Sequence, residues 1–253
     1  MGKVIVEKNG PVRTVWMNRP EKRNALDSEL LNEMITAMKA PVAAEDRVIV
    51  VRGKGNVFCA GLDMKERSRS AGAGEASGIE VMLRAIELCP LPVVAVVQGD
   101  AIAGGNELAL HCDLVIASDK ARFGMSLAQV GLAPNWFLAK KLMEVLGPVT
   151  TREMLLLGDP LPATKLHALG LIARCVPAAE LEAEARKVID RLAANAPLSL
   201  KAMKALTVRQ LEFRDGIAHD DVDALVRAAM QSQDAQEGMK ARLEKRTARF
   251  QGK

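Results

Sequence analysis

The sequence predicts an α/β fold, and two observations support the prediction. Short apolar segments alternate with amphipathic segments of helical period through the first three quarters of the 253 residues. From Leu181 onward the pattern is helical almost to the end, and Pro197 is its clearest interruption. Alternating strands and helices are typical of α/β domains. We therefore expect a mixed core over residues 1–196 and a helical region over residues 197–253.

The N-terminal part predicts a hairpin, a helix and a buried strand. Asn9-Gly10 separates two strand-like segments, which is a hairpin pattern. Apolar residues at helical spacing then follow a capping residue, Asp27 or Ser28. The expected elements are strands at Val4–Val6 and Val12–Met17, a helix at Asp27–Met38 and a strand at Arg47–Val51.

The rest of the core predicts further alternation of the same kind. A helix opens at Asp63, and the small, polar, glycine-rich stretch Ser68–Gly78 predicts a mobile loop. The elements expected after it are helices at Ile79–Leu88, Asn106–Cys112, Ala139–Leu146, Thr151–Leu157, Ala163–Leu169 and Glu237–Phe250, and strands at Pro92–Val97, Leu114–Ala117 and Leu171–Val176. Gly147-Pro148 is expected to end the helix that begins at Ala139.

Composition narrows the class of protein. With 49% hydrophobic and 26% charged residues, a globular protein is expected, and the net charge of +4 gives no case for a nucleic-acid partner. The four cysteines form no CxxC pair, and with three histidines no spacing typical of metal ligands occurs. We expect a cytoplasmic protein without a metal, since no segment resembles a signal peptide or approaches the length of a membrane span.

Two glycine-containing turns follow predicted strands and point to chemistry. The first is Phe58-Cys59-Ala60-Gly61-Leu62-Asp63, and the second is Ala103-Gly104-Gly105-Asn106-Glu107. Two backbone N–H groups that converge on one oxygen stabilise an oxyanion, and Glu107 offers a carboxyl beside the second turn. Tight packing where a helix meets a strand is the alternative interpretation of either turn taken alone.

Motifs along essentially the whole chain resemble those of the crotonase (enoyl-CoA hydratase/isomerase) superfamily. They occur in the family order and comprise Asn18-Arg19-Pro20, Arg23-Asn24-Ala25-Leu26, Phe58–Asp63, Gly104–Ala109, Cys112-Asp113, Ala121–Gly124, Ala168–Leu171 and Glu244-Lys245-Arg246. The resemblance implies a spiral of ββα turns with a C-terminal helical trimerisation region, assembled as a trimer or a dimer of trimers.

The resemblance also implies a substrate and a site. The substrate is an acyl-CoA thioester, so that coenzyme A is part of the substrate and no separate cofactor is expected. Its carbonyl oxygen lies between the N–H groups of Leu62 and Gly104, and Glu107 matches the first catalytic glutamate of family hydratases. Residues implied in binding are Lys22, Arg23, Ala25, Ala60, Gly61, Asp63, Met64, Gly105, Leu127, Asn135 and Lys245, of which Lys245 matches a lysine that pairs with CoA phosphate.

The chain departs from the family hydratases at their second glutamate. The matching position is Leu127, and Asn135 stands where some relatives have a catalytic aspartate. An apolar Leu127 dries the pocket and is expected to raise the pKa of Glu107. Hydration with Glu107 alone, isomerisation, decarboxylation or C–C chemistry, and acyl-CoA binding without catalysis all stay open at this point. His111, four residues after Glu107, is either a core residue or one that orients this carboxyl.

Overall fold

The computed structural model describes residues 2–67 and 78–253. Their central feature is a six-stranded sheet in the order β1-β2-β3-β4-β6-β9, in which only β1 runs antiparallel to its neighbour. A smaller sheet has the order β5-β7-β8. The strands are β1 Val4–Asn9, β2 Val12–Met17, β3 Val48–Gly53, β4 Val93–Val97, β5 Ala101–Ile102, β6 Leu114–Ser118, β7 Arg122–Gly124, β8 Leu161–Pro162 and β9 Arg174–Val176.

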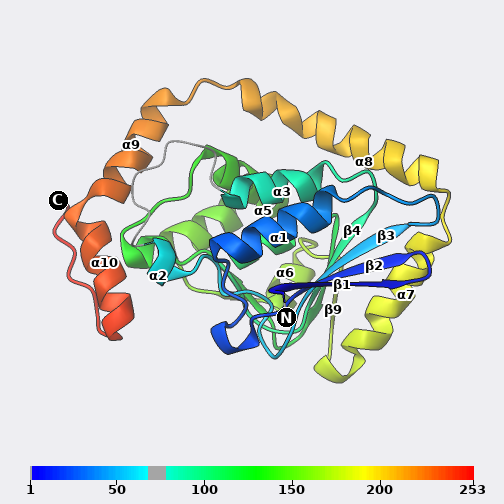
Figure 1. Ribbon diagram of the computed structural model, residues 1–253. Helices are drawn as coiled ribbons and strands as arrows, with labels where there is room; N and C mark the ends of the chain where they lie inside the picture. The colour runs from blue at the N-terminus through cyan, green and yellow to red at the C-terminus, as the bar shows by residue number, and fades with distance from the viewer. Residues whose placement is uncertain (1, 68–77) are drawn as a thin grey trace.

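Helices cover both faces of the large sheet and extend beyond one end of it (Figure 1). They are α1 Ser28–Lys39, α2 Met64–Arg67, α3 Gly78–Glu87, α4 Gly104–Leu110, α5 Trp136–Arg152, α6 Ala163–Ala168, α7 Leu181–Ala193, α8 Pro197–Leu211, α9 Asp220–Gln231 and α10 Gln233–Glu244. The predicted α/β class is confirmed.

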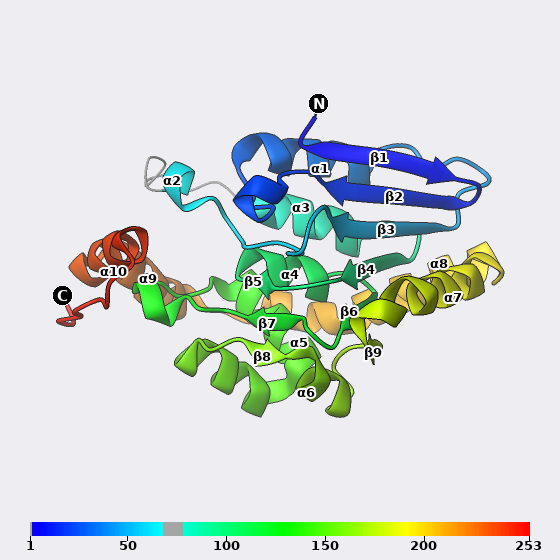
Figure 2. The same cartoon turned by 90° about the horizontal axis from the view of Figure 1, so that it is seen from below.

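The chain alternates between the two sheets, which makes it a spiral. It passes from β4 in the large sheet to β5 in the small one, through α4, and back to β6 and then β7 (Figure 2). The segment after β3 makes the same step without a full strand, because Cys59 forms a parallel bridge with Ala101. Each crossing therefore brings a turn from a different part of the sequence to the same edge.

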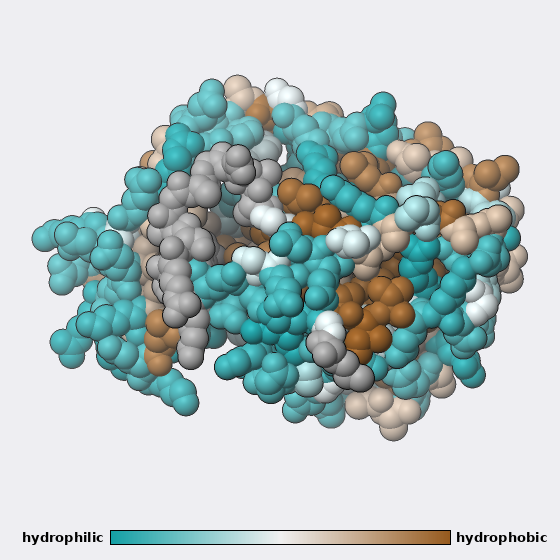
Figure 3. All heavy atoms as spheres, viewed as in Figure 1, coloured by the Kyte–Doolittle hydropathy of each residue, from teal (hydrophilic) through white to brown (hydrophobic). Residues whose placement is uncertain are grey.

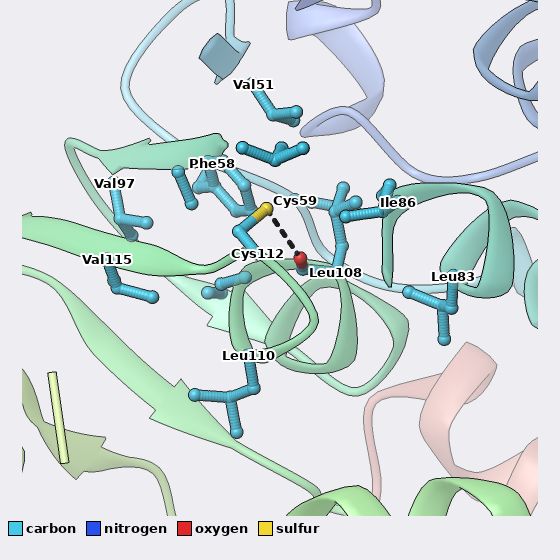
Figure 4. Packing of buried hydrophobic residues seen from close by; sticks show 14 of the residues in the cluster. Val51, Phe58, Cys59, Leu83, Ile86, Val97, Leu108, Leu110, Cys112 and Val115 are labelled. Carbon is cyan, nitrogen blue, oxygen red and sulfur yellow. Dashed lines mark hydrogen bonds between the residues drawn. The ribbon is translucent and has the colours of Figure 1, made fainter. Parts of the chain in front are cut away.

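Side-chain alternation along the central strands separates two cores. Ile49 and Val51 face the core beneath α1, α3 and α4, whereas Val48 and Val50 face α7. Figure 4 shows α4 within the larger core, where Cys112 Sγ donates a hydrogen bond to the Leu108 carbonyl at 3.2 Å. α4 is fully enclosed, since each of its seven residues is buried.

Most predicted elements occur, with some differences in their bounds. The segment labelled α5 consists of two helices, because Gly147, with a φ of 66° and a ψ of 173°, is non-helical and interrupts it where Gly147-Pro148 was predicted to end the first helix. Its last turn leads directly into a π-helical segment, Glu153–Leu157. β9 begins at Arg174 rather than Leu171, because the Leu171 N–H donates to the Leu166 carbonyl and closes the end of α6.

The basic C-terminal stretch is helical only in part. We predicted a helix to Phe250, but α10 ends at Glu244 and Lys245 caps it in the left-handed conformation with a φ of 55°. The residues beyond turn back, so that the N–H groups of Gln251 and Gly252 each donate to the Asp234 carboxylate at 2.7 Å.

The structure leaves two predictions open, namely the division into two regions and the loop over Ser68–Gly78. α8 begins at the predicted boundary, Pro197, while the division into residues 1–196 and 197–253 stays a prediction. The loop predicted over Ser68–Gly78 lies outside the described residues, apart from Gly78, which begins α3.

Candidate active site

The two predicted glycine turns lie side by side. The Ile102 N–H donates to the Cys59 carbonyl at 2.9 Å, which aligns the two segments. A Cβ atom added to Gly61 would lie 2.9 Å from the Ile102 oxygen and 3.1 Å from the Gly104 nitrogen. Gly61 also has a φ of +88°, which glycine adopts without strain. Both the conformation and the contact therefore require glycine here.

Two hydrogen bonds on the opposite side fix the first turn. The Leu26 N–H donates to the Gly61 carbonyl at 2.8 Å, and the Asp63 N–H donates to the Leu26 carbonyl at 2.9 Å. The Leu62 N–H between them has no hydrogen-bond acceptor within residues 2–67 and 78–253, and neither has the Gly104 N–H at the start of α4. These are the two donors that the sequence predicted for an oxyanion.

Ala103, which precedes the second donor, has an unusual backbone conformation. Its φ is 50° and its ψ is −116°, a region that a residue with a Cβ seldom occupies. Two hydrogen bonds fix it there: its N–H donates to the Gly124 carbonyl at 2.7 Å, and its carbonyl accepts from the Glu107 N–H at 3.0 Å.

The motif around Arg19 supports the first turn. The Arg19 guanidinium reaches the Ala25 carbonyl at 2.5 Å and Asp63 Oδ2 at 3.2 Å. The fully buried Asn24 donates from Nδ2 to the Val57 carbonyl at 2.8 Å. This part of the motif is therefore scaffold for the turn.

A cavity of about 420 Å³, the inner cavity, opens in front of the two donors. Its wall includes the predicted residues Ala60, Leu62, Met64, Gly104, Leu127 and Asn135. A second, more open cavity of about 510 Å³, the outer cavity, shares Ala60, Leu62 and Met64 with it and adds Lys22, Ala25 and Asp63. The two cavities meet at Leu62, so a long ligand can pass from one to the other beside a donor N–H.

Glu107 lies one helical turn after Gly104 but behind the wall of the inner cavity. Its side chain is fully buried, and it is absent from the lining of the inner cavity. Neither carboxyl oxygen has a hydrogen-bond partner among residues 2–67 and 78–253. This burial raises the pKa of Glu107 well above its ordinary value, the predicted direction, while the Lys141 cation opposes the shift. Burial therefore favours the protonated, neutral form of this carboxyl.

His111 packs against Glu107 as a neutral ring. Burial lowers the pKa of His111 to about 3, and the nearby Lys141 cation lowers it further. Its Nδ1 lies 2.8 Å from the Glu107 carbonyl and 3.7 Å from Glu107 Oε2. Because the ring is neutral, the second distance is no ion pair, and the ring donates to the backbone carbonyl through Nδ1. His111 is therefore a core residue that packs against Glu107, while the alternative in which it orients the carboxyl stays a prediction.

The cation that influences both groups is itself neutralised. Lys141 Nζ lies 2.6 Å from Glu87 Oε1 and 3.2 Å from Glu144 Oε2, all three side chains being nearly buried. The pairing raises the pKa of Lys141 and lowers that of Glu87. Because Lys141 is paired with Glu87 and Glu144, it does not serve as a counterion of Glu107.

The inner cavity contains a carboxylate that the sequence did not single out. Glu80, in the first turn of α3, lines it and accepts a 2.5 Å hydrogen bond from Asn135 Nδ2. Met230 of α9 and Arg242 of α10 also reach this wall. No local sequence pattern marks these residues, because packing between distant helices brings them there.

Four predicted binding residues are absent from the linings of both cavities, one of them being Gly61, which packs against the second turn. Arg23 pairs with Asp100 at 3.3 Å and is largely exposed. Gly105 packs beneath the site, since an added Cβ would lie 2.1 Å from the Cys59 carbonyl oxygen. Lys245 caps α10 at its C-terminus. In the described part of the chain, no three His, Cys, Asp or Glu side chains are placed to hold a metal ion.

Comparison with known proteins agrees with this architecture. The chain is similar to the enoyl-CoA hydratase EchA19 of Mycobacterium tuberculosis, with 31% identity over 98% of this chain and 96% of the relative. It superposes on an enoyl-CoA hydratase from Mycobacterium avium subsp. paratuberculosis with a TM-score of 0.85 and 31% identity, covering 99% of each chain. A methylmalonyl-CoA decarboxylase in complex with 2-nitronate-propionyl-CoA gives a TM-score of 0.92 at 26% identity, again over 99% of each chain.

These likenesses define a crotonase-fold protein, as the resemblance of the motifs implied. The enoyl-CoA hydratase/isomerase family model matches residues 7–253, and the chain belongs to that family. None of the helices in the described ranges combines the length and the apolar character needed to cross a membrane.

Proposed function

We propose that the protein is an acyl-CoA enzyme that adds water to, or removes it from, a 2-enoyl-CoA thioester. The observation that supports this most is the pair of unpaired N–H groups, Leu62 and Gly104, that two adjacent turns present to one cavity. A thioester oxygen placed between them gains negative charge when an enolate forms, and fixed donors stabilise that charge.

The remaining residues take roles that follow from their positions. The acyl group occupies the inner cavity, and the pantetheine arm follows Ala60 and Met64 into the outer cavity beside Lys22. Lys245 is proposed to meet a CoA phosphate. Glu107 transfers the proton at the α-carbon as acid or base, for which its side chain has to turn toward the inner cavity when substrate binds.

Replacement of one carboxyl tests this proposal. Glu107→Gln is expected to lower the turnover of crotonyl-CoA by about 10²–10⁴-fold, the usual contribution of general acid–base catalysis. Binding of a CoA ester, measured by calorimetry, is expected to persist because the N–H groups and the cavities are unchanged. Turnover at the rate of the unmodified protein would contradict the role of Glu107.

Decarboxylation is the second candidate, and the TM-score of 0.92 with a methylmalonyl-CoA decarboxylase favours it. When a carboxylate leaves the α-carbon as CO2, the electrons of the broken bond form the same enolate, which then needs one proton. A single acid, Glu107, and the apolar wall at Leu127 suit this step. Release of CO2 from a malonyl-type CoA ester, compared with hydration of crotonyl-CoA, separates the two reactions.

We also propose a trimer or a dimer of trimers. The C-terminal helices expose large apolar side chains, among them Leu198 at 80%, Leu225 at 71% and Phe213 at 64%. Figure 3 shows further hydrophobic patches among hydrophilic residues on the face that it draws. Contiguous apolar surface of this kind is typical of interfaces. Sedimentation equilibrium measures the mass, and a monomer at micromolar concentration would contradict the assembly.

A further inference from the structure

Glu80 lines the inner cavity together with Leu127, the residue at the position of the second glutamate of family hydratases. We propose that Glu80 is the second proton-transfer residue of the site, and that Asn135 positions it. This inference rests on the proposed function, because it assigns the group that activates water for the same hydration reaction.

The position of Glu80 is set by contacts with the oxyanion turn. Its neighbour Ile79 is buried, and a Cβ added to Gly104 would lie 2.7 Å from Ile79 Cδ1. The first turn of α3 therefore packs directly on the residue that offers the second N–H donor. Glu80 is half-buried and lines the same cavity as Leu62 and Leu127.

Asn135 has its amide orientation fixed from one side. It is the N-cap of α5, where its Oδ1 accepts the Leu138 N–H at 3.0 Å. The amide nitrogen then points the other way and donates to Glu80 Oε1 at 2.5 Å. This bond holds one carboxylate oxygen of Glu80 beside Asn135 at the wall of the inner cavity. The arrangement directs Glu80 into the cavity although Asn135 itself cannot act as a base.

Two carboxyl groups in unlike surroundings divide acid and base work. The Glu107 carboxyl is enclosed, which favours its protonated form, whereas Glu80 borders the cavity as a hydrogen-bond acceptor. In hydration, water oxygen bonds to the β-carbon and its proton passes to Glu80. The π electrons move to the thioester oxygen between the N–H groups of Leu62 and Gly104. Glu107 then protonates the α-carbon, and the proton on Glu80 returns to Glu107 through solvent, which balances the cycle.

The test compares two reactions of one variant. Glu80→Gln keeps an oxygen that accepts from Asn135, so the tie between α3 and α5 persists while the base is lost. We expect hydration of crotonyl-CoA to fall by about 100-fold or more. Exchange of the α-protons of butyryl-CoA with deuterated water uses the ionised fraction of Glu107 as the base together with the two N–H donors, and it involves no activation of water. It is therefore expected to stay within about twofold of the unmodified protein.

Two further variants complete the experiment. Asn135→Ala removes the hydrogen bond from Asn135 to Glu80 but keeps the carboxylate, and hydration is expected to fall by about tenfold, less than in Glu80→Gln. Glu29→Gln is the matched control, because Glu29 is a first-turn carboxylate on α1 and its side chain is 63% exposed. It is expected to leave both reactions unchanged.

The outcomes separate the inference from the function that it rests on. Hydration at the unmodified rate in Glu80→Gln overturns the role of Glu80 and leaves the hydratase proposal intact. Equal loss of hydration and exchange also overturns it, since Glu80 would then not be specific to the water step. Absence of both reactions in the unmodified protein overturns the proposed function itself, and the role of Glu80 with it.

Discussion

The two halves of the candidate site are built from different parts of the polypeptide. The oxyanion half consists of backbone N–H groups in two turns that hydrogen bonds tie together and to Leu26. The proton-transfer half consists of side chains from three helices, with Glu80 on α3, Glu107 on α4 and Asn135 on α5. The first half is fixed before substrate arrives, whereas the second depends on side-chain positions that substrate can change.

The largest loss of activity is expected from a substitution that disturbs the oxyanion half. Gly61→Ala places a Cβ 2.9 Å from the Ile102 carbonyl at a φ of +88°, so the turn has to move away from Gly104. We expect both hydration and α-proton exchange to fall by about 10²–10³-fold, the effect of losing one oxyanion donor. Steady-state rates and deuterium incorporation measure the two losses.

Gly10→Ala is the control for backbone strain. Gly10 also has a positive φ, of +56°, but its added Cβ would meet nothing within 4 Å. This variant is expected to lose a little stability and no activity. An equal loss of activity in both variants would show that general destabilisation, rather than the lost donor, causes the effect of Gly61→Ala.

The buried, neutral ring of His111, which packs against Glu107, predicts that the stability of the protein depends on pH. His111 has a pKa of about 3 when folded and 6.5 when free, so only the unfolded state binds its proton between these values. Stability is therefore lost as pH falls from about 6.5 toward 3, by up to about 1.4 kcal/mol per pH unit. His111→Gln removes this loss. The free energy of unfolding in urea is therefore expected to fall less between pH 7 and pH 5 for this variant than for the unmodified protein. Parallel curves for the two proteins would contradict a buried neutral His111.

The smallest expected effect concerns the outer cavity. Lys22→Ala removes a cation beside the proposed CoA path. An exposed charge contributes up to about 1 kcal/mol, so we expect the KM for crotonyl-CoA to rise by at most about fivefold with kcat unchanged. Lys120→Ala, at a 77% exposed side chain that lies in neither cavity, is the control. A change in kcat for Lys22→Ala would contradict this prediction, because it would show that Lys22 acts in the chemical step and not only in CoA binding.

The same contrast explains what the sequence could predict. The turns at Gly61 and Gly104 were predicted because glycine spacing and flanking apolar strands are local patterns, and the motifs occur in the family order. The three short strands of the small sheet, β5, β7 and β8, were missed, because two or three residues carry no clear period. Their pairing nevertheless brings the turns together.

The side-chain half was predicted less well. Leu127 and Asn135 line the inner cavity as expected, but the partner of Asn135 is 55 residues away in the sequence, and nothing local identifies Glu80. The basic C-terminal stretch was read as helix to Phe250, whereas Asp234 and Glu237 bind the returning backbone and the Arg246 side chain. Hydrophobic periodicity along the sequence does not predict tertiary contacts of this kind.

The conformation of Ala103 has a consequence for how stable this protein can become. A residue with a Cβ in that region costs on the order of 1–3 kcal/mol, against a total folding stability of about 5–15 kcal/mol for an ordinary domain. Selection for heat tolerance alone would favour relaxing this peptide, for example by admitting glycine there. The same relaxation would loosen the N–H of Gly104, so thermostability and a rigid oxyanion donor are opposing demands at one position of the chain.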